Sequence, residues 1–166
     1  MNILRMLKHL MLPDWWRRRV FAAADLAVIG AAVSASEQTH RGEVRFVAEA
    51  SLAVSTLWRD RSPRQRAAEV FAAEGVWDTE ENSGVLIYLQ LVDHRIEIVA
   101  DRGIARKVEQ AQWDAICRRM EARFRAGEFE GGALAAVDDI TALLQVHFPP
   151  GDTNPDELPD RPVVLV

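Results

Sequence analysis

The fold is decided by residues 76–104, which read VWDTEENSGVLIYLQLVDHRIEIVADRGI. The run from residue 84 to residue 92 is almost wholly apolar, which is typical of a central strand covered on both faces. Asp93 and His94 then form a short polar turn, and residues 95–100 return as the second strand of a hairpin. Acidic turns lie at the ends of both strands. The stretch therefore predicts a buried hairpin whose ends carry carboxylates.

Helical and strand patterns surround this hairpin. Four segments repeat apolar residues at helical spacing and one further segment alternates as a strand does: helices at about 24–40, 62–75, 110–126 and 129–147, and the strand at 43–52. Helices interleaved with strands cover both faces of a sheet. The order therefore predicts an α/β fold, namely a three-layer α/β/α sandwich with a small mixed sheet and helices on both faces.

The composition suits a single globular domain, because 49% of the 166 residues are hydrophobic and 27% are charged. The formal net charge of -5 argues against nucleic acid as a partner. The single cysteine, Cys117, cannot form an intrachain disulfide, and its helical, apolar surroundings indicate a core position. The chain shows neither a transmembrane run nor a signal-peptide cleavage site, so we expect a cytoplasmic protein.

The sequence divides into three parts. Residues 1–20 are a basic, aromatic lead-in, residues 21–150 form the α/β domain, and residues 151–166 read as a flexible tail rich in Pro and Asp. The lead-in, with Trp15 and Trp16 among arginines, has two interpretations: contact with a membrane surface, or packing of the tryptophans on the domain. Packing is favoured because a proline interrupts any continuous amphipathic helix.

Several motifs, in this order and spacing, resemble the TPM domain family, and in particular its compact bacterial cytoplasmic branch. The motifs are His40 to Phe46, Trp77-Asp78-Thr79-Glu80, Asn82, Gly84 to Tyr88, His94-Arg95, Glu97 to Gly103 and Gly127-Glu128-Phe129. The resemblance covers about residues 24–149. It implies a small α/β/α sandwich, in agreement with the pattern above.

The same resemblance implies little about activity. Members of the family are often labelled phosphatases, and some related domains bind calcium or magnesium. Many members are secreted or anchored by a C-terminal helix, and these roles are not carried over to this chain. Proteins that share a fold or a family can have different activities, so the resemblance does not determine the reaction.

The candidate metal ligands are oxygen-bearing side chains at strand ends, and they point to Ca2+ or Mg2+. Asp78 and Asn82 precede the central strand, and Asp101 ends the returning strand, so these three are expected to converge. Glu43 is expected to join them only if its strand runs antiparallel to the central strand; otherwise Glu49 does. In the alternative interpretation these carboxylates cap turns or form ion pairs.

Two functions follow as hypotheses. The first is a domain that binds a divalent cation at this acidic corner and acts through a protein partner. The second is a divalent-metal-dependent phosphatase that hydrolyses phosphate esters without a covalent intermediate. The sequence has no Gly-x-Ser-x-Gly or HExxH motif, and Cys117 lies in the middle of a helix.

Overall fold

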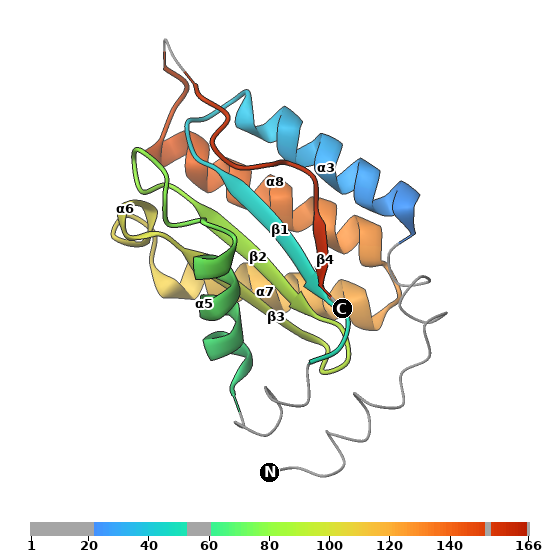
Figure 1. Ribbon diagram of the computed structural model, residues 1–166. Helices are drawn as coiled ribbons and strands as arrows, with labels where there is room; N and C mark the ends of the chain where they lie inside the picture. Colours follow the sequence, from blue (N-terminus) through green and yellow to red (C-terminus); the bar gives the residue numbers. More distant parts are fainter. Residues whose placement is uncertain (1–21, 53–60, 152–153, 166) are drawn as a thin grey trace.

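A four-stranded sheet with the strand order β3-β2-β1-β4 forms the centre of the computed structural model, which describes residues 22–52, 61–151 and 154–165 (Figure 1). The strands are β1 (Val44–Glu49), β2 (Val85–Gln90), β3 (Arg95–Ala100) and β4 (Val163–Leu165). Strand β1 runs parallel to both β2 and β4, whereas β2 and β3 form the antiparallel hairpin. The sheet is therefore mixed, as the sequence predicts.

Helices cover both faces of this sheet (Figure 1). The described helices are α3 (Ala23–Glu37), α5 (Pro63–Ala73), α6 (Arg102–Ala105), α7 (Gln110–Arg125) and α8 (Phe129–His147). Helices α3, α7 and α8 pack on one face, and α5 packs on the other. The predicted three-layer α/β/α sandwich is confirmed. None of the described helices is long and apolar enough to cross a membrane.

The alternation in β1 explains why the sheet has two cores. Val44 and Phe46 pack in the large core under α3, α7 and α8, whereas Val47 points to the smaller core under α5. Successive side chains of a strand point to opposite faces of the sheet, so neighbouring residues of β1 pack in different cores. Every residue of β1 and β2 is buried, as a central pair covered on both sides requires.

Local signals set where helix α5 begins. The Ser62 hydroxyl accepts a hydrogen bond from the Gln65 backbone N–H, and the Gln65 side chain accepts one from the Ser62 N–H in return. Pro63 occupies the first helical position, where a missing N–H costs nothing. The predicted start of this helix is thus confirmed.

Three details differ from the sequence analysis. The end of the expected flexible tail is instead strand β4, which pairs with β1 and extends the sheet. The corner after β3 forms the short helix α6. The hairpin turn spans residues 91–94 rather than two residues, and His94 has a φ of 50° in it. The expected lead-in, residues 1–20, lies outside the described residues.

Candidate functional site

Asn82 and Asp101 meet where the chain enters β2 and leaves β3, as expected, and they bond to neighbouring residues there, while the Asp101 Oδ2 is buried without a hydrogen-bond partner in the described part of the chain. Asp101 is the N-cap of α6, and its Oδ1 accepts a hydrogen bond from the Arg102 N–H at 2.6 Å. The Arg102 Nε donates to the Asn82 Oδ1 at 2.5 Å. The Asn82 carbonyl accepts from the Gly103 N–H at 2.9 Å. These bonds describe a structural corner of the capping kind.

Asp78 lies on the exposed turn that follows α5. Its backbone N–H donates to the carbonyl of Gly75 at 2.9 Å, and the residue is exposed. In the described part of the chain, Asp78 and Asp101 are absent from the group of carboxylates that converge on one point. The structure therefore brings Asn82 and Asp101 together without gathering the expected set around an ion.

Glu43 directly precedes β1. The expectation that only an antiparallel β1 would bring Glu43 to the start of β2 is wrong. Strand β1 is parallel to β2, and parallel pairing places Glu43 beside the start of β2, where its carbonyl accepts from the Val85 N–H at 2.8 Å. Its carboxylate accepts from the Leu158 N–H at 3.1 Å. The alternative, Glu49, lies at the opposite end of β1 and forms an ion pair with Arg66 at 2.7 Å.

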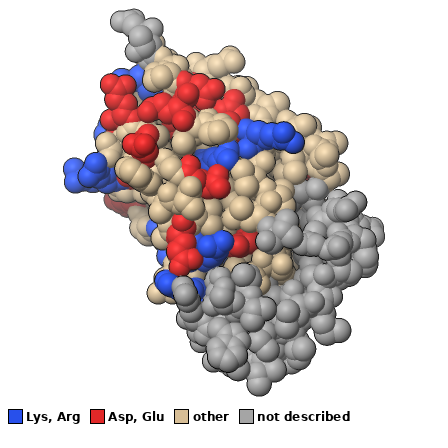
Figure 2. Space-filling model, viewed as in Figure 1, with Lys and Arg blue, Asp and Glu red and all other residues tan. Residues whose placement is uncertain are grey.

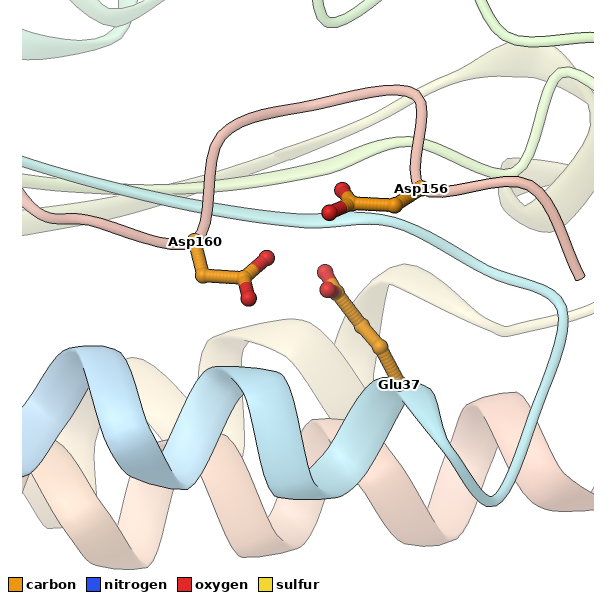
Figure 3. A group of neighbouring side chains, drawn as sticks. All are labelled: Glu37, Asp156 and Asp160. Atoms are coloured by element: carbon orange, nitrogen blue, oxygen red, sulfur yellow. The ribbon is translucent and has the colours of Figure 1, made fainter.

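A different group of carboxylates does converge. Glu37, Asp156 and Asp160 each offer a carboxylate oxygen, and these oxygens all lie within 4.8 Å of one another. Figure 3 shows the three side chains pointing toward one another, with Glu37 rising from α3 and the two aspartates descending from the segment that leads into β4. We call Glu37, Asp156 and Asp160 the carboxylate cluster. Glu43 lies in the wall of the same hollow.

Backbone hydrogen bonds hold the carboxylate cluster in place. The Val44 N–H donates to the Glu37 Oε1 at 2.9 Å, so the start of β1 fixes this side chain. The Asn154 amide donates to the Glu37 carbonyl at 2.6 Å. Arg45 donates to the carbonyls of Pro159 and Arg161, and thereby fixes the segment that carries both aspartates. The cluster is therefore built on anchored elements at both sides.

Burial favours the protonated form of the carboxyl groups in this hollow. Burial raises the pKa of Glu37 to about 9, with a further rise from its hydrogen bond to Asp160. Burial likewise raises the pKa of Glu43 to about 7. The Asp160 Oδ1 is buried and has no hydrogen-bond partner in the described part of the chain. Buried carboxylates of this kind need a proton or a cation beside them.

The hollow above the cluster offers the ligands that hard divalent cations prefer. It has a volume of about 190 Å³ and opens to solvent. Its wall contains the four carboxylates together with Ser34, Gln38 and Asn154. Carboxylate and amide oxygens are the usual ligands of Ca2+ and Mg2+. The residues present thus fit a divalent cation.

The described residues offer little for nucleophilic catalysis. Cys117 is half-buried on α7, and burial raises the pKa of its thiol to about 12, so the thiol stays protonated. His94 is exposed at the tip of the β2–β3 hairpin. The core position expected for Cys117 is consistent with its packing beside the large core.

Glu37, Asp156 and Asp160 do not stand out in the sequence, for a physical reason. Glu37 appears as the polar end of a helix, and the two aspartates lie in a segment whose composition is typical of a mobile tail. The signal that could have found them is the Asp-x-x-x-Asp spacing just before a short Val-Val-Leu run, which ends the chain as β4.

The fold and this cluster define a class: a small α/β/α domain with carboxylates gathered between α3 and its C-terminal segment. A family model for the TPM domain matches residues 17–143. The chain belongs to the TPM domain family. The match contains all four residues expected from the sequence, Glu43, Asp78, Asn82 and Asp101, whereas Asp156 and Asp160 lie beyond it.

Solved structures resemble this fold. The NMR structure of the BA42 protein from the psychrophilic bacterium Bizionia argentinensis sp. nov. is 26% identical, with a TM-score of 0.76, and the match covers 87% of this chain and 94% of that one. The N-terminal domain of a P. gingivalis protein is 20% identical over 78% and 79% of the two chains, with a TM-score of 0.63.

A third resemblance is the N-terminal domain of the cg2496 protein from Corynebacterium glutamicum, at 13% identity and a TM-score of 0.56 over 81% of this chain and 80% of that one. The last two structures support the fold alone. No curated protein matches the chain.

Proposed function

We propose that this TPM domain binds a divalent cation, Ca2+ or Mg2+, at the carboxylate cluster. The observation that carries the proposal is the convergence of Glu37, Asp156 and Asp160 within 4.8 Å around a buried, unpartnered Asp160 oxygen. Burial raises the pKa of Glu37 to about 9, and a divalent cation would replace its proton and offset the cost of burying the carboxylate. The resemblance to domains that bind calcium or magnesium supports the same ions.

The cluster links two parts of the chain that are far apart in sequence. Glu37 ends α3, whereas Asp156 and Asp160 belong to the C-terminal segment. A cation held by all three would therefore change how firmly that segment is attached. The proposal includes a protein partner, as the sequence analysis expects, and a surface altered by the cation would give that partner something to recognise.

Isothermal titration calorimetry with CaCl2 and with MgCl2 on the whole chain tests this site. Wild-type protein should bind, and Glu37→Gln and Asp160→Asn should each weaken binding at least tenfold. Both changes keep the side-chain shape and replace one carboxylate ligand by an amide. The matched control is Asp101→Asn, which makes the same carboxylate-to-amide change outside the cluster and keeps a residue that caps helices well.

The control also separates this site from the corner that the sequence analysis favours. If Asp101→Asn removes binding while Glu37→Gln preserves it, the cation binds at the corner of Asp78, Asn82 and Asp101 and the cluster is not the site. If no variant changes the heat of binding, neither set of residues holds the ion.

A metal-dependent phosphatase is the second candidate, and the name of the matched family model, TPM_phosphatase, favours it. A cation in the open hollow could lower the pKa of a bound water and supply the nucleophile. Hydrolysis of p-nitrophenyl phosphate in the presence of MgCl2 tests this function. Activity that disappears in Glu37→Gln but persists in Asp101→Asn would support it, and no activity above buffer would overturn it.

A further inference from the structure

A second hollow lies on the other side of Asp160, between α3 and the chain that enters β4. Its volume is about 660 Å³, in the range of sites that bind a sizeable group. Ala23, Leu26, Ala27 and Gly30 form its α3 wall, and Pro162 and Val164 form the other wall. We call this hollow the α3–β4 groove. Most of its lining is apolar.

Helix α3 carries apolar residues on the side that packs in the large core and also on sides that the core does not cover. Ile29 and Val33 are fully buried in the large core, yet Val28 remains 42% exposed. Ala27 and Ala31, which line the groove, are also exposed. A helix that is apolar all round is normally covered on every side. The groove therefore leaves apolar residues of α3 exposed, although the composition of this helix favours burial.

We propose that the α3–β4 groove is the docking site of the chain's own residues 1–21. This segment joins α3 directly through Ala22, so it begins at the end of the groove. Twelve of its 21 residues are hydrophobic, including Trp15 and Trp16. Large side chains from the segment match an α3 wall that is rich in alanine, since alanine extends little beyond the helix backbone.

The reach of the segment is sufficient. The α3 wall of the groove runs from Ala23 to Ser34, a length of about 17 Å at 1.5 Å per helical residue. A segment of 21 residues spans about 30 Å even when it is helical, and more when it is extended. It can therefore turn back and lie along the whole groove.

Charge favours the same occupant. Residues 1–21 contain five basic residues and one acidic residue, so they carry +4, while the remainder of the chain carries -9. The groove meets the hollow of the carboxylate cluster at Ser34 and Asp160, which line both. A basic, apolar segment in the groove would place cations near this acidic end. This docking is independent of the proposed cation site.

Hydrogen–deuterium exchange of the whole chain, read by mass spectrometry, tests the docking. The groove variant is Ala27→Lys with Ala31→Lys, which introduces two positive charges among the lining side chains. The matched control is Ala24→Lys with Ala35→Lys, at exposed positions of α3 outside the groove. Both variants add the same charge to the same helix.

Docking predicts slow exchange of residues 1–21 in wild type and in the control, and exchange at least tenfold faster in the groove variant. Exchange at the rate of an unstructured peptide in wild type would overturn the proposal, as would unchanged protection in the groove variant. Protection that increases with protein concentration would assign the groove to a second copy. Protection that appears only with anionic phospholipid vesicles would assign the segment to a membrane.

A cross-linking measurement keeps the test valid if the groove variant folds poorly. A benzophenone group at position 27, attached through Ala27→Cys in a Cys117→Ser background, should cross-link within the same molecule to residues 1–21. Cross-links confined to other regions of the chain would contradict the docking.

Discussion

Gly84 lies where the chain passes from the acidic turn into β2, and its missing side chain is a packing requirement. A Cβ atom at this position would lie 2.1 Å from the Val76 carbonyl oxygen and 2.9 Å from the Val76 Cγ1. Backbone atoms cannot yield as a flexible side chain can. The close approach of the turn to β2 therefore depends on this glycine.

We expect Gly84→Ala to lower the free energy of unfolding by about 2–3 kcal/mol, because the added methyl group forces the turn away from β2. Urea denaturation measures this change. The control is Gly131→Ala in helix α8, where the nearest atom to a new Cβ is an Arg123 nitrogen at 3.6 Å. That substitution should stabilise by about 0.5–1 kcal/mol. Equal effects of the two substitutions would contradict this view of Gly84.

His40 is a fully buried titratable residue between α3 and β1. The Gly42 N–H donates to its Nδ1 at 3.2 Å, and its Nε2 has no hydrogen-bond partner in the described part of the chain. Burial lowers the pKa of His40 below its ordinary value of 6.5. The unfolded chain therefore takes up a proton near pH 6.5, whereas the folded chain takes it up only at a lower pH.

It follows that His40 destabilises the fold as the pH falls through 6.5. Between pH 7.5 and pH 5.5 we expect the wild type to lose about 1 kcal/mol of unfolding free energy relative to His40→Asn, which can still accept from Gly42. Denaturant melts at the two pH values measure the difference. Parallel pH profiles for wild type and variant would show that His40 is protonated equally in both states.

At the scale of elements, the C-terminal segment is part of the domain. Leu158 is buried in the smaller core with Val47, Leu86 and Tyr88, and β4 adds to the edge of the sheet beside β1 (Figure 1). An element attached only by backbone pairs at an edge would be weak. The side chain of Leu158 supplies the additional apolar contact.

We therefore expect Leu158→Ala to cost about 2–4 kcal/mol of stability, as is usual for a buried leucine. The matched control is Val164→Ala in β4, whose side chain is 40% exposed and which should cost ~0.5 kcal/mol. Chemical denaturation of both variants checks this. If Leu158→Ala has no effect, the segment contributes nothing to the core.

Some of the helices and strands can be predicted from the sequence, and others cannot. The hairpin of β2 and β3 is evident because a long apolar run, a polar turn and a second strand are local features. Strand β4 has only three residues, and its partner β1 lies more than 110 residues earlier in the chain. Its pairing is a tertiary effect that local propensity does not encode. Helix α6, of four residues, is equally short.

In the candidate site, too, local features can be predicted from the sequence and long-range contacts cannot. The corner of Asn82 and Asp101 is predictable because the hairpin register brings its two ends together. The carboxylate cluster combines the end of α3 with the C-terminal segment, so Glu37 is separated from both aspartates by more than 110 positions. Only the folded chain places them side by side, and only then does burial shift the pKa of Glu37.

At the scale of the whole molecule, acidic side chains gather on one region of the surface, at the end of the sheet where the C-terminal segment crosses it (Figure 2). The carboxylate cluster lies where this segment meets α3: Glu37 is buried, Asp160 is half-buried and Asp156 is exposed. Like charges near one another destabilise the compact state. A divalent cation would therefore stabilise the entire fold as well as the local site.

Thermal unfolding should show this stabilisation. A ligand that binds only the folded state at 100 times its Kd adds about 2.7 kcal/mol, which corresponds to a rise in Tm of about 5–10 °C for a chain of this size. CaCl2 or MgCl2 should raise the Tm of wild type and of Asp101→Asn equally, and raise that of Glu37→Gln by about half as much or less. A similar rise in all three proteins would indicate general screening of surface charge.

The most direct test of the cation site is an NMR titration of the cation-free whole chain with CaCl2 and MgCl2, followed through backbone amide shifts. The account predicts saturable shifts at residues 36–44 and 154–161, which surround the carboxylate cluster. Shifts confined to residues 78–84 and 101–103 would place the ion at the corner of Asn82 and Asp101 instead. The absence of saturable shifts at millimolar ion would contradict cation binding by this domain.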